Sequence, residues 1–118
     1  MQSGNIIQIK SYKFALRIIK LSKYIVEEKK EFVLSKQILR SGTSIGANVE
    51  EAIGAQSKKD FIAKLQIALK ETRETHYWVR LLIDSKYLEK EKAQSLLKEC
   101  EELLKLLITI LKTSKANS

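Results

Sequence analysis

RSGTSIGANVEEAIGAQSKKDFIAKLQIAL, residues 40–69, is the stretch that decides the fold of this chain. Six residues in it and just before it recur at alternating spacings of four and three, which places them on one line along a helix. They are Leu34, Ile38, Ser41, Ile45, Asn48 and Ala52. A neighbouring line holds Leu39, Gly42, Gly46, Val49 and Ile53. The stretch therefore predicts a helix that packs along polar and glycine positions as well as apolar ones.

The two glycines in this helix need a physical reason, because each costs about 1 kcal/mol relative to alanine in a helix interior. We interpret Gly42 and Gly46 as positions where another helix comes close, since a residue without Cβ lets two backbones approach. The alternative is that the chain breaks into two helices at one of them. The absence of proline and the constant phase of Ile38, Ile45 and Ala52 favour one continuous helix.

A polar cluster of Arg40, Ser44, Asn48 and Glu51 is predicted on one flank of the same helix. If these side chains are buried, they must pair with one another, because an unsatisfied buried polar group costs roughly 1–3 kcal/mol. We interpret the cluster as structural, fixing the register of neighbouring helices. A functional site is the alternative.

Length and composition indicate a single helical domain over residues 1–118. The chain is 44% hydrophobic and 31% charged, and it contains no proline. One cysteine, Cys100, excludes an internal disulfide and favours a reducing cytoplasm. The N-terminus does not resemble a signal peptide, and no apolar run approaches the roughly 20 residues of a membrane span. A soluble cytoplasmic protein is expected.

Apolar periodicity predicts an all-α fold, an antiparallel up-down-up-down four-helix bundle. The helices are expected at about residues 11–28, 32–55, 58–84 and 90–112. Residues 1–10 are expected to form a loose arm, and residues 113–118 to fray. Ser57 followed by Asp60 is a variant of the capping box and predicts where the third helix begins. That helix carries a regular seam of Phe61, Leu65, Ala68, Thr72, Thr75, Val79 and Leu82.

The first helix combines apolar and basic faces. Its apolar lines predict a wide packing face made of Phe14, Ile18, Leu21 and Ile25 together with Tyr12, Leu16, Ile19 and Val26. On another face, four cations recur at spacings of three, four and three with no acid among them: Lys10, Lys13, Arg17 and Lys20. The net charge is +8, and residues 1–36 carry eight Lys and Arg against three acids. The line predicts contact with an anionic partner such as nucleic acid, and a solvated helix surface is the alternative.

A second apolar set lies on the third helix, away from its seam: Ile67, Trp78 and Leu81. Because one helix face cannot bury both sets against three neighbours, these residues predict a subunit interface, where tryptophan is over-represented. Core packing of Trp78 is the alternative.

The chain lacks the residue patterns that a catalytic site or a metal site needs. A di-iron bundle needs Glu-x-x-His twice, but this chain has one histidine, His76, preceded three residues earlier by Arg73. No feature indicates an activated nucleophile, and no glycine loop has the phosphate-cradling pattern. We therefore expect no metal, no cofactor, no small-molecule substrate and no enzymatic activity.

Nearly the whole chain resembles a known family. The segments that carry the resemblance are SYKFALRIIKLSK (11–23), LSKQILRSGTSIGANVEEA (34–52), SKKDFIAKLQIALKE (57–71) and ETHYWVRLL (74–82). The most diagnostic residues are Arg40, Ser44, Ile45, Asn48 and Glu51, followed by Ser57 and Phe61. On these residues the chain resembles the bacterial four-helix bundle proteins encoded in intervening sequences of 23S ribosomal RNA genes. Gly46 and Ala52 stand where many members have proline and glycine, which leaves the fold inference intact.

The resemblance implies a four-helix bundle that assembles into a ring, a homopentamer, with a basic surface. The accessory protein of diversity-generating retroelements is similar in architecture and binds nucleic acid and its reverse transcriptase. No reaction is established for the family, and an RNA-related role is only proposed.

Two functional hypotheses follow. The first is a non-enzymatic, oligomeric protein that binds nucleic acid, RNA in particular, and whose helix 1 cations contact phosphates with little sequence preference. No aromatic-rich RNA-recognition motif supports base readout. The second is an oligomeric scaffold for a protein partner such as a polymerase or reverse transcriptase.

Overall fold

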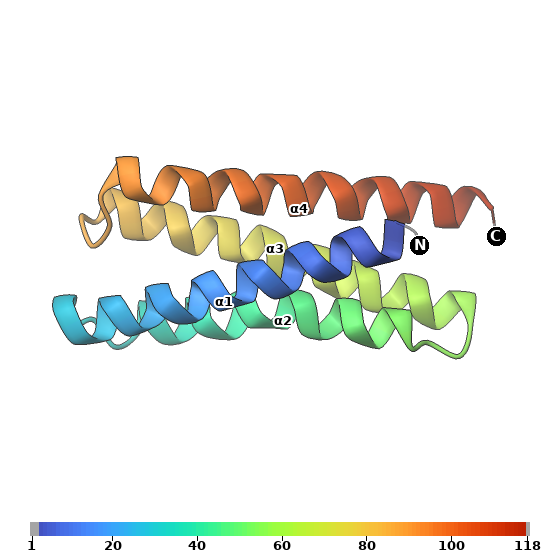
Figure 1. Cartoon of the computed structure of the whole chain (residues 1–118), viewed down its shortest axis with the longest axis horizontal. Coiled ribbons are helices and arrows are strands. Elements are labelled where there is room, and N and C mark those ends of the chain that lie inside the picture. The colour runs from blue at the N-terminus through green and yellow to red at the C-terminus, as the bar shows by residue number, and fades with distance from the viewer. Residues whose placement is uncertain (1–2, 118) are drawn as a thin grey trace.

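The computed structural model describes residues 3–117 and contains four α-helices over that range. They are α1 (Ser3–Lys29), α2 (Leu34–Ile53), α3 (Lys58–Asp84) and α4 (Lys90–Ala116). Figure 1 shows them side by side along the long axis, each antiparallel to the one before, in a rod of 47 × 22 × 21 Å. The predicted up-down-up-down four-helix bundle is confirmed. None of the described helices is long and apolar enough to cross a membrane.

The outer helices are longer than predicted. The prediction of a loose arm is wrong for residues 3–10, which are the first turns of α1. Ile7 is buried there, four residues before buried Ser11, so the seam of α1 extends one turn further back than its weak helix formers suggested. At the other end, α4 continues to Ala116 rather than fraying after Lys112, because buried Leu111 holds its last turns and no proline or glycine follows.

The start of α2 is fixed by a carboxylate that the sequence pattern did not reveal. Glu31 accepts hydrogen bonds from the backbone N–H groups of Val33, Leu34 and Ser35, at 3.1, 2.8 and 2.8 Å. These are donors that the first turn of a helix otherwise leaves unsatisfied. The helix consequently begins at Leu34 rather than Phe32. By contrast, the predicted cap of α3 is confirmed, with Ser57 Oγ accepting from the N–H of Asp60 at 3.0 Å.

The two glycines of α2 lie where α1 comes close, as predicted. A Cβ added to Gly42 would lie 2.7 Å from both Cγ1 and Cγ2 of Ile18, which is fully buried. A Cβ at Gly46 would lie 3.4 Å from the backbone oxygen of Ser11. The helix is continuous through both positions, so the alternative of a break at Gly42 or Gly46 is wrong.

The interior combines aliphatic side chains with small satisfied polar groups. The hydroxyls of Ser41 and Thr75 lie 2.9 Å apart across α2 and α3, and both residues are buried. Cys100 Sγ donates to the Thr72 carbonyl oxygen at 3.4 Å. Burial and the nearby Glu101 charge raise the pKa of the Cys100 thiol to about 12, so it is un-ionised at neutral pH. Within the described residues, every buried side-chain nitrogen and oxygen has a hydrogen-bond partner.

Candidate nucleic-acid interface

A groove runs between α1 and α4, and we refer to it as the α1–α4 groove. Three hollows of about 480, 290 and 300 Å³ follow one another along it, joined by shared lining residues. Arg17 lines the first and second hollows, and Lys10 and Glu102 line the second and third. While glycines let α2 pack tightly on α1, the seam between α1 and α4 remains open.

All four predicted cations lie along this groove. Lys10, Lys13 and Arg17 line the second hollow, and Lys20 lines the first together with Arg17. The spacing of three, four and three on α1 thus presents a row of positive groups beside α4. The sequence pattern predicted the row, and the fold gives it a concave surface.

The opposite wall supplies acids that the sequence did not place there. Arg17 Nη1 lies 2.9 Å from Glu99 Oε2, and Arg17 Nη2 donates to Ser95 Oγ at 3.0 Å. Lys10 Nζ lies 3.6 Å from Glu102 Oε1. Exposed pairs of this kind are worth about 0–1 kcal/mol, so a phosphate can compete with the carboxylates for either cation.

Lys13 and Lys20 are the uncompensated members of the row. Both side chains are exposed, and within residues 3–117 neither has an acid at ion-pair distance. An ammonium on an exposed, flexible stem can reach an incoming phosphate. These two residues are therefore the strongest candidates for contact with an anion.

The first hollow combines apolar side chains, of which the sequence analysis named Leu21 for helix packing, with groups that it did not single out. Its apolar lining comes from Leu21, Leu88, Ala93 and Leu96, and its aromatic group is Tyr24. Lys92 and Glu89 lie 3.5 Å apart at its edge. Tyr24 belongs to α1 and the leucines come partly from α4 and the turn before it, so no local spacing links them.

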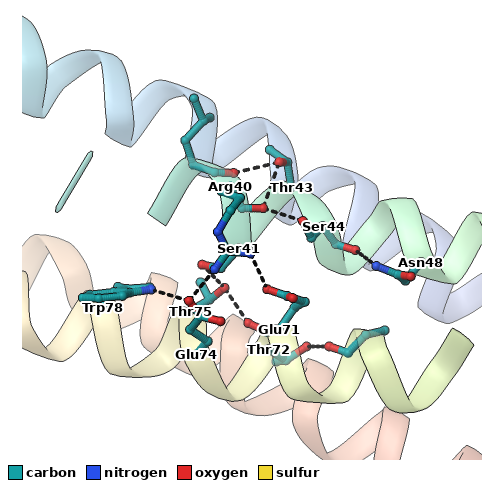
Figure 2. A network of polar contacts seen from close by, with 12 residues as sticks. Arg40, Ser41, Thr43, Ser44, Asn48, Glu71, Thr72, Glu74, Thr75 and Trp78 are labelled. Carbon is teal, nitrogen blue, oxygen red and sulfur yellow. Dashed lines mark hydrogen bonds and ion pairs between the residues drawn. The ribbon is translucent and has the colours of Figure 1, made fainter. Parts of the chain in front are cut away.

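The polar cluster predicted on α2 is divided between two sets of contacts (Figure 2). Arg40 does not pair with Glu51; its guanidinium binds Glu71, at 3.1 Å, and Glu74 on α3. Asn48 and Ser44 instead donate within their own helix, to the carbonyl oxygens of Ser44 and Arg40 at 2.9 and 2.6 Å. Glu51 is exposed, with Lys64 Nζ 3.9 Å away. Mutual pairing was expected only if the four were buried, and that condition is not met: Arg40 and Glu51 are exposed, and α3 supplies their partners.

The contacts of Arg40 link α2 to α3. Figure 2 shows Glu74 between Arg40 and Trp78, whose Nε1 donates to the Glu74 carboxylate at 3.2 Å. Partial burial alone raises the pKa of Glu74. The hydrogen bonds from Arg40 and Trp78, with the charges of Arg40 and Lys70, outweigh that effect and bring the pKa below its usual 4.5. The hydrogen bond to Glu74 raises the pKa of Arg40 further above its usual range, against a smaller opposing effect of burial.

The lowered pKa of Glu74 predicts a pH-dependent contribution to stability. Its ionised form is favoured in the folded state, so the contribution is present above the unfolded pKa and lost as the pH falls through the folded pKa. We expect Glu74→Gln to lower the free energy of unfolding at pH 7 by up to about 1 kcal/mol and to have little effect well below pH 4. Urea unfolding followed by the single tryptophan, Trp78, measures both values. Glu51→Gln is the control, and the same loss at both pH values would contradict the prediction.

The residues predicted for a subunit interface differ in their surroundings. Ile67 is exposed, whereas Trp78 is partly buried against the core and contacts Tyr77 edge-on, with ring centroids 5.2 Å apart. Leu81 is half-buried. The core-packing alternative for Trp78 is therefore realised in part, and the interface remains a prediction.

A larger apolar surface lies on α1, and we call it the α1 stripe. Five side chains on it are 43–63% exposed: Ile6, Ile9, Tyr12, Leu16 and Ile19. The expectation that Tyr12, Leu16 and Ile19 belong to a packing face within the bundle is wrong. α1 buries only the line through Phe14 and Ile18, because it contacts two neighbours and leaves its outer side open.

Comparisons with known proteins identify a family and a similar solved structure. The model of a family described as 23S rRNA-intervening sequence protein matches residues 4–109. A solved structure from Bacteroides thetaiotaomicron, described as a protein of unknown function from the S23 ribosomal protein family, is 55% identical. The alignment has a TM-score of 0.92 and covers 94% of this chain and 99% of that one. A comparison with curated proteins finds no match.

Proposed function

The chain belongs to the family of 23S rRNA-intervening sequence proteins, and from this premise we propose that it is a non-enzymatic protein that binds nucleic acid, RNA in particular. The binding surface is the α1–α4 groove. The observation that carries the proposal is the placement of Lys10, Lys13, Arg17 and Lys20 along one concave seam. Such a row contacts phosphates by charge and gives little sequence preference.

Salt dependence provides the direct test. If four cations contact phosphates, affinity for a structured RNA should fall roughly 100-fold between about 50 and 200 mM salt, because each contact releases a condensed counterion. Fluorescence anisotropy of a labelled RNA at both concentrations measures this. A protein without detectable affinity at the lower concentration would not be an RNA-binding protein of this kind.

The α1 stripe supports a proposal that the protein works as an oligomer, a homopentameric ring. Contiguous exposed apolar side chains on a monomer typically mark an interaction surface. Another copy of the same chain is a partner that is always present. Ile67, Trp78 and Leu81 remain the second candidate interface. Mass in solution tests the assembly.

The α1 stripe also supports the alternative function, an oligomeric scaffold for a protein partner such as a polymerase or reverse transcriptase. An exposed line at spacings of three and four is the pattern by which one helix packs on another. Reversing the charge of the groove cations distinguishes the two functions. Loss of binding to a protein partner with unchanged RNA affinity would favour the scaffold.

A further inference from the structure

We infer that the first hollow of the α1–α4 groove receives an unstacked nucleobase of a bound single strand; the inference rests on the proposed function. The hollow, of about 480 Å³, has the size of a small-molecule site. Its apolar lining and its tyrosine suit a flat aromatic group rather than a bare phosphate. This end of the groove therefore has a chemistry that differs from the charged second hollow.

Tyr24 is the group on which the base stacks. Its side chain is 43% exposed, which leaves ring surface accessible in the hollow that it lines. Leu21, Leu88 and Leu96 complete an apolar surround for the base. Stacking on an aromatic side chain tolerates any base, because every base presents a π-face.

Charge at the edge of the hollow fits the phosphates on either side of that base. Among residues 3–117 no acid pairs with Lys20, and Arg17 is held in place by Ser95 and Glu99 with further N–H donors available. A guanidinium already ordered by its neighbours loses less conformational entropy when it binds. A nucleotide whose base lies in the hollow and whose phosphates lie toward Arg17 and Lys20 contacts both the apolar and the basic surface.

The occupant is a single strand rather than a duplex. Bases in a helix are stacked and paired, so none is available to enter a hollow, whereas loops, bulges and ends present free base faces. The second hollow has no aromatic lining residue and contacts backbone phosphates of either form.

The test compares Tyr24→Ala on two RNAs of equal length, a single-stranded oligouridylate and a blunt duplex, by fluorescence anisotropy at about 50 mM salt. We expect about a 10-fold loss of affinity for the single strand and no change for the duplex. Tyr24→Phe keeps the ring and should bind as the wild type does. Tyr77→Ala, which removes a similarly exposed tyrosine from α3, is the matched control.

Each other outcome is decisive. An equal loss on both RNAs, or no loss on either, overturns the inference and leaves phosphate binding standing. Wild-type protein that binds neither RNA overturns the proposed function together with the inference. Uridine 5′-monophosphate is titrated separately, and tighter binding of this nucleotide than of the strand would make a free nucleotide the occupant and overturn the inference. Circular dichroism of Tyr24→Ala and Tyr24→Phe verifies that both variants are folded.

Discussion

Reversing the charge of Lys13 and Lys20 together, as Lys13→Glu and Lys20→Glu, is expected to weaken RNA binding by roughly 100-fold or more at about 50 mM salt. Each phosphate contact contributes through counterion release a factor on the order of 10 at that concentration. The variant loses two such contacts and adds two repulsive charges. Because neither lysine has a paired acid in the part of the chain that the structure describes, the change breaks no ion pair there and should leave stability nearly unaltered.

The matched control places the same change of charge elsewhere. Lys58→Glu with Lys59→Glu alters the net charge equally, but at the start of α3. Neither residue lines any of the three hollows of the α1–α4 groove. Carboxylates in the first turn of a helix are favourable, so this control should fold. If the two double variants weaken RNA binding equally, only the overall charge matters and the groove is not the site. If neither does, phosphate contact by the groove is contradicted.

Gly42→Ala is expected to lower the free energy of unfolding by about 1–2 kcal/mol, although alanine is the better helix former. The new Cβ would lie 2.7 Å from Cγ1 and Cγ2 and 3.1 Å from Cβ of Ile18. Those atoms belong to a β-branched, fully buried side chain close to its own backbone, so they cannot move aside without displacing α1. The overpacking cost of about 1–3 kcal/mol exceeds the gain in helix propensity of about 1 kcal/mol.

Gly54→Ala is the control for this effect. A Cβ added at Gly54 would lie 3.8 and 4.0 Å from its nearest neighbours, the backbone oxygens of Glu50 and Glu51. Alanine should therefore be neutral or slightly stabilising at this position. Urea unfolding of both variants gives the comparison. Ile18→Ala should lower the free energy of unfolding less in the Gly42→Ala variant than in the wild type, because it removes the Ile18 atoms that clash with the new Cβ. Equal stability of the two glycine variants would mean that α1 does not approach α2 so closely.

The helices and their inner faces could be predicted from the sequence, because both depend on short-range periodicity. The phase shared by Ile38, Ile45 and Ala52 is a property of one helix, and each of these residues is buried as predicted. The Ser57 cap needs only a residue three positions away, and the closeness implied by Gly42 follows from the cost of glycine in a helix. Where long helices ended was less certain, since weak helix formers at residues 3–5 were overridden by the burial of Ile7.

Which groups meet across helices depends on the packing of the bundle and could not be predicted from the sequence pattern. Arg40 binds Glu71 and Glu74, and Arg17 binds Glu99, because the rotation and register of α3 and α4 bring those carboxylates within reach. Periodicity defines a face but says nothing about which neighbour covers it, which is why the α1 stripe and the hollow at Tyr24 were not foreseen. Both arise because α1 lies tightly against α2 and leaves a groove toward α4, and that asymmetry is set by packing among helices distant in the chain.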